Sequence, residues 1–161
     1  MPDPNRDQSS ELTKHLISRP ALRPACAEDF DYCARLYFEG MDDIIKELNL
    51  DMDAQVAGLR QRWDVEQVRI ITLEGTDIGW LQSFVQDDAL FLGQLFVDGA
   101  WRRQGIGTDV VKSLIEEAAR AGHALTLGVV KTNPALRLYE RLGFCTTHED
   151  ACKFYMRRAC E

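Results

Sequence analysis

The clearest hydrophobic pattern in the chain is a helical stripe that begins after Gly107. Apolar residues recur there with a period of 3.6, while Glu116, Glu117 and Arg120 fall on the opposite face. The apolar positions are Val110, Val111, Leu114, Ile115, Ala118 and Ala119. The pattern predicts an amphipathic helix, and Gly122 is typical of a residue that ends one.

Short β-rich runs surround this helix. Three of them, residues 68–73, 78–85 and 89–97, are separated by polar turns and predict an antiparallel meander. A continuous apolar run at 124–130 follows the helix. A strand, a helix and a strand in this order predict a parallel pair with a right-handed crossover, so the sheet should be mixed.

The N-terminal part of the chain is less regular. Residues 1–20 are polar and bounded by prolines, which predicts a flexible arm or a short helix. Residues 21–25 predict a first strand. Helical sequence then runs from about residue 28 to Trp63, with a break near residues 49–51.

The loop before the amphipathic helix suits an anion. It reads Arg102-Arg-Gln-Gly-Ile-Gly107 and leads into a helical first turn, whose N–H groups lack intrahelical partners. A P-loop would need a lysine between Gly107 and Thr108, and a dinucleotide-binding loop would need a glycine at Val110. Both are disfavoured, which leaves another pyrophosphate loop or an ordinary strand-to-helix turn with surface arginines.

A second informative stretch spans residues 131–144. Asn133 suits the N-cap of a helix, and Pro134 suits its first position, where the missing N–H costs nothing. Gly143 suits a left-handed residue after the helix end, with Phe144 packing back on the last turn. A short helix with defined ends is predicted.

The two stretches together resemble motifs of the GCN5-related N-acetyltransferase (GNAT) superfamily. Residues 102–107 are similar to its Arg/Gln-x-x-Gly-x-Gly/Ala loop, and residues 133–144 to its Asn-x-x-Ala/Leu-x-x-x-Tyr-x-x-x-Gly-Phe segment. Their order and separation also match, and the resemblance extends from about Leu22 to Arg158. It implies an α/β (α+β) fold with a mixed, mostly antiparallel seven-stranded sheet, a splayed central parallel pair and about four helices, in one domain at residues 21–161.

The resemblance also implies a co-substrate, acetyl-coenzyme A, and the residues that bind it. The pantetheine arm is expected on the strand backbone, the pyrophosphate on loop N–H groups, and one further hydrogen bond from an asparagine. These cofactor-binding residues are Leu95, Phe96, Val97, Arg102, Arg103, Gln104, Gly105, Ile106, Gly107, Thr108 and Asn133. Tyr139 is the implied catalytic residue, with its hydroxyl near the sulfur.

One position departs from the family pattern. Many members carry a glutamate just before the end of the central strand, where this chain has Leu92-Gly93-Gln94. A glutamine cannot act as a base. We expect Asp87, Asp88, Asp98 or a carboxylate of the first helices to act through water instead.

Composition restricts the partners. The 161 residues carry a net charge of −7 with dispersed basic residues, which disfavours nucleic acid and mildly favours a cationic substrate. No apolar run approaches the roughly 20 residues of a membrane span, and the start has no signal-peptide core. We therefore expect a cytoplasmic protein without a membrane partner, and we keep a homodimer open.

The five cysteines do not form a recognisable metal or disulfide framework. They include no Cys-x-x-Cys pair, and the three histidines are scattered, so we expect no metal site. Most cysteines are expected in the core, with Cys160 as the exposed thiol.

The expected function is transfer of an acetyl group to a primary amine by direct attack. We expect a small-molecule amine ahead of a protein acceptor. The absent glutamate leaves open a non-catalytic domain that binds or senses acetyl-coenzyme A, and a nucleotide-binding α/β module is a more remote alternative.

Overall fold

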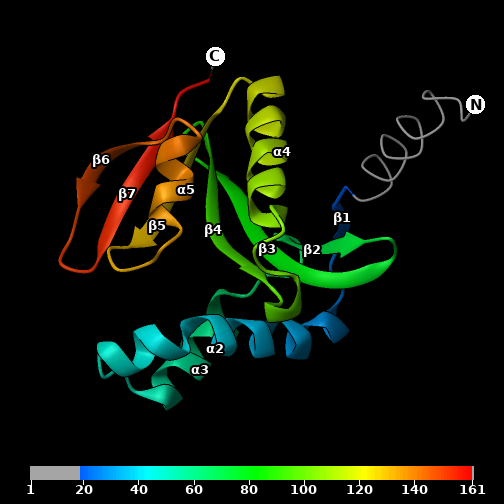
Figure 1. Cartoon of the computed structure of the whole chain (residues 1–161), viewed down its shortest axis with the longest axis vertical. Coiled ribbons are helices and arrows are strands. Elements are labelled where there is room, and N and C mark those ends of the chain that lie inside the picture. Colours follow the sequence, from blue (N-terminus) through cyan, green and yellow to red (C-terminus); the bar gives the residue numbers. More distant parts are fainter. Residues whose placement is uncertain (1–18, 161) are drawn as a thin grey trace, which may run out of the picture.

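A computed structural model describes residues 19–160 and shows one seven-stranded sheet with helices on both faces (Figure 1). The strand order is β1-β2-β3-β4-β5-β7-β6. The strands are β1 (Ala21–Pro24), β2 (Val68–Leu73), β3 (Thr76–Gln86), β4 (Ala89–Val97), β5 (Ala124–Val130), β6 (Cys145–Glu149) and β7 (Lys153–Arg158). The α-helices are α2 (Phe30–Glu47), α3 (Met52–Arg62), α4 (Ile106–Arg120) and α5 (Leu136–Arg141). Only β4 and β5 are parallel, so the predicted fold class is confirmed.

Two clusters of buried side chains hold the helices on opposite faces of the sheet. On one face, Val111 and Leu114 of α4 pack with strand residues such as Leu125, and Tyr139 of α5 joins the same cluster. On the other face, the helices α2 and α3 pack on Trp80 and its neighbours. Successive apolar residues of β2 and β3 point to opposite faces of the sheet, so these two strands contribute side chains to both clusters.

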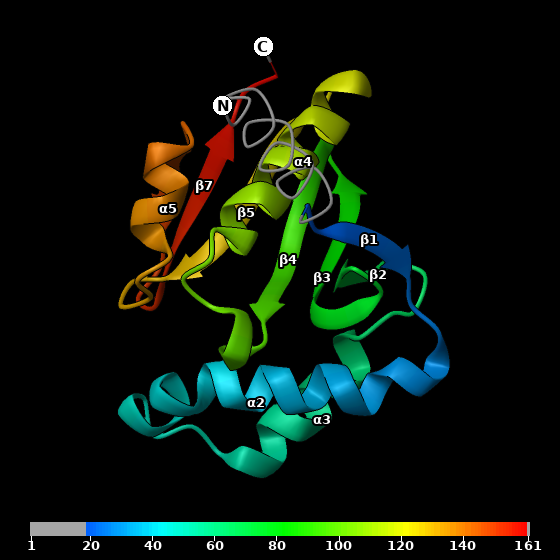
Figure 2. The ribbon, with the colours of Figure 1, turned by 45° about the vertical axis from the view of Figure 1, so that its right-hand side comes forward.

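The parallel pair is short because its two strands separate. β4 and β5 pair only over residues 89–92 and 124–127. On its other side, β4 pairs with β3, where Gln94 lies opposite Gln82 and Leu92 lies opposite the next residue, Ser83. Gly93 is therefore left without a partner and forms a bulge. A bulge bends a strand and increases its twist. Beyond it, β4 runs toward α2 while β5 turns away with β7 (Figure 2).

Most predicted element ends lie close to those observed. Gly122 and Gly143 both have positive φ, at 73° and 92°, as expected for residues that end helices. The helix α5 begins at Leu136, two residues later than the predicted start at Pro134. Asn133 still caps the turn, since its Oδ1 accepts a hydrogen bond from Ala135 N at 2.9 Å.

The expectation that most cysteines are core residues is wrong. Only Cys33 is buried among the five, and all five are free thiols. Cys145 and Cys152 belong to the terminal hairpin, where every residue of the edge strand β6 is exposed. An edge strand without a covering helix offers no interior position for a small apolar side chain.

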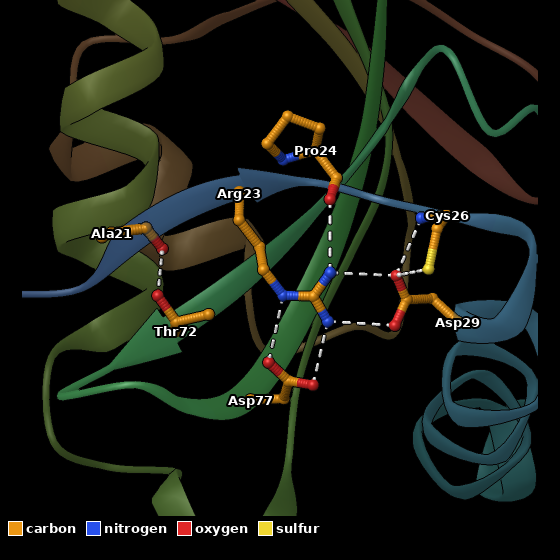
Figure 3. A network of polar contacts seen from close by, with 7 residues as sticks. All are labelled: Ala21, Arg23, Pro24, Cys26, Asp29, Thr72 and Asp77. Carbon is orange, nitrogen blue, oxygen red and sulfur yellow. Dashed lines mark hydrogen bonds and ion pairs between the residues drawn. The ribbon is translucent and has the colours of Figure 1, made fainter.

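One ionic network joins β1 to the start of α2 and to β3 (Figure 3). The Arg23 guanidinium donates to both carboxylate oxygens of Asp29, at 3.0 and 2.9 Å, and to those of Asp77, at 3.3 and 3.0 Å. The backbone N–H of Cys26 also donates to Asp29. The bonds from Arg23, helped by that of Cys26, hold the pKa of Asp29 down at about 2.

This network predicts a loss of stability in acid. Because folding lowers the Asp29 pKa from 3.8, its contribution is complete above pH 4 and lost as the pH falls toward 2. Asp29→Asn should reduce the free energy of unfolding by about 2 kcal/mol at pH 7. Urea unfolding of both proteins from pH 7 to 2 measures the difference. A difference that stays constant down to pH 2 would contradict the assignment.

Candidate functional site

A cleft of about 730 Å³ opens where β4 and β5 separate. Its walls come from α2, α3, β3, β4, β5, α5, the start of β7 and the loops beside them. Four of the predicted site residues meet in it, although they lie up to 44 positions apart. They are Leu95, Phe96, Asn133 and Tyr139. The bend in β4 therefore creates a space that the two halves of the sheet share.

Phe96 forms a rigid wall of the cleft. Its ring stacks on Trp80 and meets Tyr37 edge-on, each at a centroid distance of 5.4 Å. Gly40 of α2 sits against the same ring, because a Cβ atom at this position would lie 2.8 Å from it. Only glycine lets α2 approach the strand so closely.

Tyr139 projects from α5 into the cleft. The residue is 8% exposed, and its ring meets Phe144 edge-on at 5.7 Å. Burial raises the pKa of Tyr139 to about 12. The hydroxyl has no hydrogen-bond partner among residues 19–160, so at neutral pH it is a protonated group with an unused donor. Tyr139 thus lines the cleft, and its predicted catalytic role remains a prediction.

Asn133 has one polar atom left for a ligand. Its Oδ1 is used in the bond to Ala135 N, so the Nδ2 amide group is the part free to donate in the cleft. Its predicted role as a cofactor-binding residue remains a prediction.

The loop after β4 exposes a run of unused donors. Within residues 19–160, no acceptor is recorded for the backbone N–H groups of residues 103–108, and the first N–H of α4 with a partner is that of Asp109, which bonds to Gly105 O. Arg103 and Gly105 adopt left-handed conformations, with φ of 63° and 78°. Successive N–H groups in such a turn at a helix N-terminus suit a phosphate or pyrophosphate.

The side chains of the loop leave this donor set open. A Cβ atom at Gly105 would meet nothing within 4 Å, and one at Gly107 would meet only Leu138 at 4.0 Å. Ile106 is buried in the core, so it can bind a ligand only through its backbone. The Nε of Arg102 donates to Val97 O at 3.2 Å and thereby ties the loop to the end of β4. The loop thus fits the pyrophosphate of coenzyme A.

The loop and the cleft are separate parts of the surface. Of the predicted loop residues, Gln104 and Ile106 line a second hollow of about 500 Å³, together with Trp101 and Asp109. None of residues 102–108 lines the large cleft. On the side of β5, the backbone of β4 from Gly93 to Val97 pairs with no strand. This unpaired edge runs from the cleft toward the loop.

None of the aspartates expected to act through water lines the cleft. Asp87 and Asp88 form the turn between β3 and β4, at the opposite end of β4 from Val97. Asp98 accepts a hydrogen bond from Ala100 N and pairs with Arg35 at 3.7 Å. None of these three is therefore part of the cleft wall, and a role as a base acting through water remains a prediction.

Several lining residues were not predicted from the sequence. Gln82 is the most informative, because it is buried in the middle of β3, with Trp80 and Phe84 two positions before and after it. A polar residue inside such a run is a usable signal. Arg62, Cys152 and Lys153 give no comparable signal, because they are surface residue types that only the tertiary fold brings to the cleft.

The described part of the chain contains neither a cluster of metal-ligand side chains nor a membrane-spanning helix. No three His, Cys, Asp or Glu side chains between residues 19 and 160 lie close enough together to hold a metal ion. Over the same range, none of the helices has the length and apolar content needed to cross a bilayer.

The chain resembles known proteins in sequence. Human cysteine-rich protein 2-binding protein is 36% identical over 77 residues, which cover 48% of this chain and 10% of that protein. The chain thus matches only a small part of that relative. An uncharacterized N-acetyltransferase of Methanocaldococcus jannaschii is 26% identical over 142 residues, or 81% of this chain and 62% of the relative.

The fold has clear counterparts among solved structures. The PaiA N-acetyltransferase of Thermoplasma acidophilum, solved with coenzyme A, superimposes with a TM-score of 0.70 at 16% identity. The match covers 87% of this chain and 98% of that one. The sequence model of the acetyltransferase (GNAT) family matches residues 38–144. The motifs, the splayed parallel strands and this match agree, and the chain belongs to the acetyltransferase (GNAT) family.

Proposed function

We propose that the chain is an N-acetyltransferase that uses acetyl-coenzyme A and acts on the primary amine of a small molecule. The observation that carries the proposal is that three features lie in order from the loop after β4, along the edge of this strand, to the cleft. Among the described residues, the N–H groups of residues 103–108 have no acceptor, the β4 edge from Gly93 to Val97 pairs with no strand on the side of β5, and Tyr139 lines the cleft.

Each feature suits one part of acetyl-coenzyme A. The loop N–H groups and the dipole of α4 bind the pyrophosphate. The unpaired edge of β4 pairs with the amides of the pantetheine arm, as an added strand would. The Nδ2 group of Asn133 donates to the same arm. These contacts direct the thioester toward Tyr139.

The carbonyl carbon of the bound acetyl group forms a bond to the amine nitrogen while the bond between this carbon and the sulfur breaks. The proton lost from the nitrogen ends on the sulfur. A backbone N–H near Leu95 donates to the carbonyl oxygen, where negative charge develops. Tyr139 donates a hydrogen bond to the leaving sulfur. With a pKa of about 12, its phenol is a weaker acid than a thiol of about 8.5, so it stabilises the thiolate without transferring its proton fully.

The size and lining of the cleft support a small acceptor. Small-molecule sites usually measure about 300–1,000 Å³ and are mostly apolar. The cleft of about 730 Å³ lies within this range, and its walls include Met41, Ile44, Leu50 and Phe84.

A non-catalytic domain that binds or senses acetyl-coenzyme A is the second candidate. It is favoured by the absence of a carboxylate from the cleft, with Gln94 at the position where many members have a glutamate. Release of coenzyme A thiol with a panel of amines separates the two. Binding of acetyl-coenzyme A without release above the rate of hydrolysis would favour the sensor.

The donor loop yields a prediction for Gly105→Glu. Its carboxylate would stand near the bound phosphates, and repulsion of roughly 3 kcal/mol should weaken acetyl-coenzyme A binding about 100-fold. Gly75→Glu is a matched control, because Gly75 also has positive φ, at 81°, and open space around it. Both variants should lose about 1 kcal/mol of stability from the left-handed residue. Calorimetry showing equal affinities for the two variants would contradict the loop assignment.

The tyrosine yields a prediction for Tyr139→Phe. Because the hydroxyl acts as a hydrogen-bond donor, kcat should fall about 10²-fold, the lower end of the range for a positioned acid. Acetyl-coenzyme A affinity and the melting temperature should hardly change. Tyr155→Phe is the matched control, since its hydroxyl bonds to Asp150 at 2.8 Å outside the cleft. Steady-state acetylation is the measurement, and an unchanged kcat in Tyr139→Phe would make Tyr139 a packing residue.

A further inference from the structure

The charge of the cleft differs from that of the whole chain. Asp and Glu make up 26 of the 161 residues, yet none of those between positions 19 and 160 lines the cleft. In this part of the chain, the charged residues that line it are Arg62 and Lys153, whose side chains are both cations. An ammonium group that enters the cleft would therefore leave water without gaining a counterion.

Gln82 presents a single unused acceptor in this environment. It is 5% exposed and is the one buried polar residue between positions 19 and 160. Its Nε2 donates to Arg62 O at 2.7 Å and to Gln67 Oε1 at 2.9 Å, which uses both amide hydrogens and fixes the orientation of the group. Its Oε1 has no recorded partner within the described residues and can accept an N–H.

Gln94 lies opposite Gln82 in the antiparallel pair of β3 and β4. Directly opposed residues project from the same face of a sheet, so the two side chains are neighbours in the cleft. Neither carries a charge. The position beside the unused Gln82 acceptor is therefore polar enough to orient an amine but lacks an anion that would stabilise its protonated form.

We propose, as an inference that rests on the proposed function, that the cleft binds the neutral form of a weakly basic amine whose remaining structure is apolar. Gln82 Oε1 accepts a hydrogen bond from one of the amine N–H groups. Burial without a counterion disfavours a charged group. The apolar walls accept the rest of the molecule. The acceptor class is thus an amine such as an α-amino group rather than a lysine-like amine.

This preference accounts for the absence of a base in the cleft. An amine that binds in its neutral form needs no residue to deprotonate it before attack. At pH 7 an α-amino group with a pKa of about 8 has a neutral fraction a few hundredfold larger than that of a lysine-like amine near 10.4. Binding then selects the reactive form directly.

Among residues 19–160, no side chain that lines the cleft is a carboxylate or a histidine. Its titratable groups are Tyr37 from α2, Arg62 from α3, Tyr139 from α5, and Cys152 and Lys153 at the start of β7. Below about pH 8, where an ordinary thiol stays protonated, the pH dependence of binding should therefore follow the amine and not the protein.

A matched pair of amines tests the proposal, 2-phenylethylamine and its less basic 2,2-difluoro analogue. Calorimetry with the protein saturated with coenzyme A measures their affinities from pH 6 to 10. Each affinity should rise about tenfold per pH unit up to the pKa of that amine, and the analogue should bind more tightly at pH 7. Tighter binding of the parent at pH 7, an affinity that does not depend on pH, or no binding of either amine overturns the proposal.

The variant Gln94→Glu provides a second test, because Gln94 makes no recorded side-chain hydrogen bond that folding would lose. The new carboxylate should stabilise the ammonium form. Affinity for 2-phenylethylamine at pH 7 should rise at least tenfold, and its pH dependence should flatten. An unchanged profile in a folded variant overturns the proposal. Release of coenzyme A thiol from acetyl-coenzyme A is measured in parallel. If the affinities of the two amines follow the expected order but no thiol is released, only the proposed enzymatic activity is contradicted.

Discussion

The hydrogen bonds between β4 and β5 stop after the pair of Leu92 and Leu127, and the candidate site depends on this interruption. Gly93 adds one unpaired residue to β4, which turns the strand away from its parallel neighbour. The result is an unpaired backbone edge in the middle of a seven-stranded sheet. In a closed sheet those N–H and C=O groups would be satisfied by a strand, and no cleft could form there.

The packing on both faces keeps the two strands apart. On one face, the Phe96 ring is held between Trp80 and the helix α2, which approaches closely because residue 40 is glycine. On the other face, α5 places Tyr139 against Phe144 at the side of β5. The walls of the cleft are therefore extensions of the two cores, and their geometry is as rigid as the cores themselves.

The sequence predicted the backbone well and the contents of the cleft poorly. The strands, the helix breaks at Gly122 and Gly143 and the donor loop all follow from local patterns that do not depend on distant residues. The start of α5 was misplaced because the side chain of Asn133 supports a turn before the helix proper. The charge of the cleft could not be read at all, because Arg62 and Lys153 reach it only through tertiary packing. The net charge of −7 describes the whole chain and not the cleft, so the expectation of a cationic substrate that rests on it remains a prediction.

The stacking of Trp80 on Phe96 links the fluorescence of a buried indole to the wall of the cleft. Trp80 is fully buried, and its indole N–H has no hydrogen-bond partner in the described structure. Its emission should therefore lie toward the blue and depend mainly on the aromatic ring beside it. Since Phe96 forms part of the cleft wall, a molecule that shifts this ring changes the surroundings of the indole. The protein thus carries an intrinsic fluorophore one residue away from its candidate binding site.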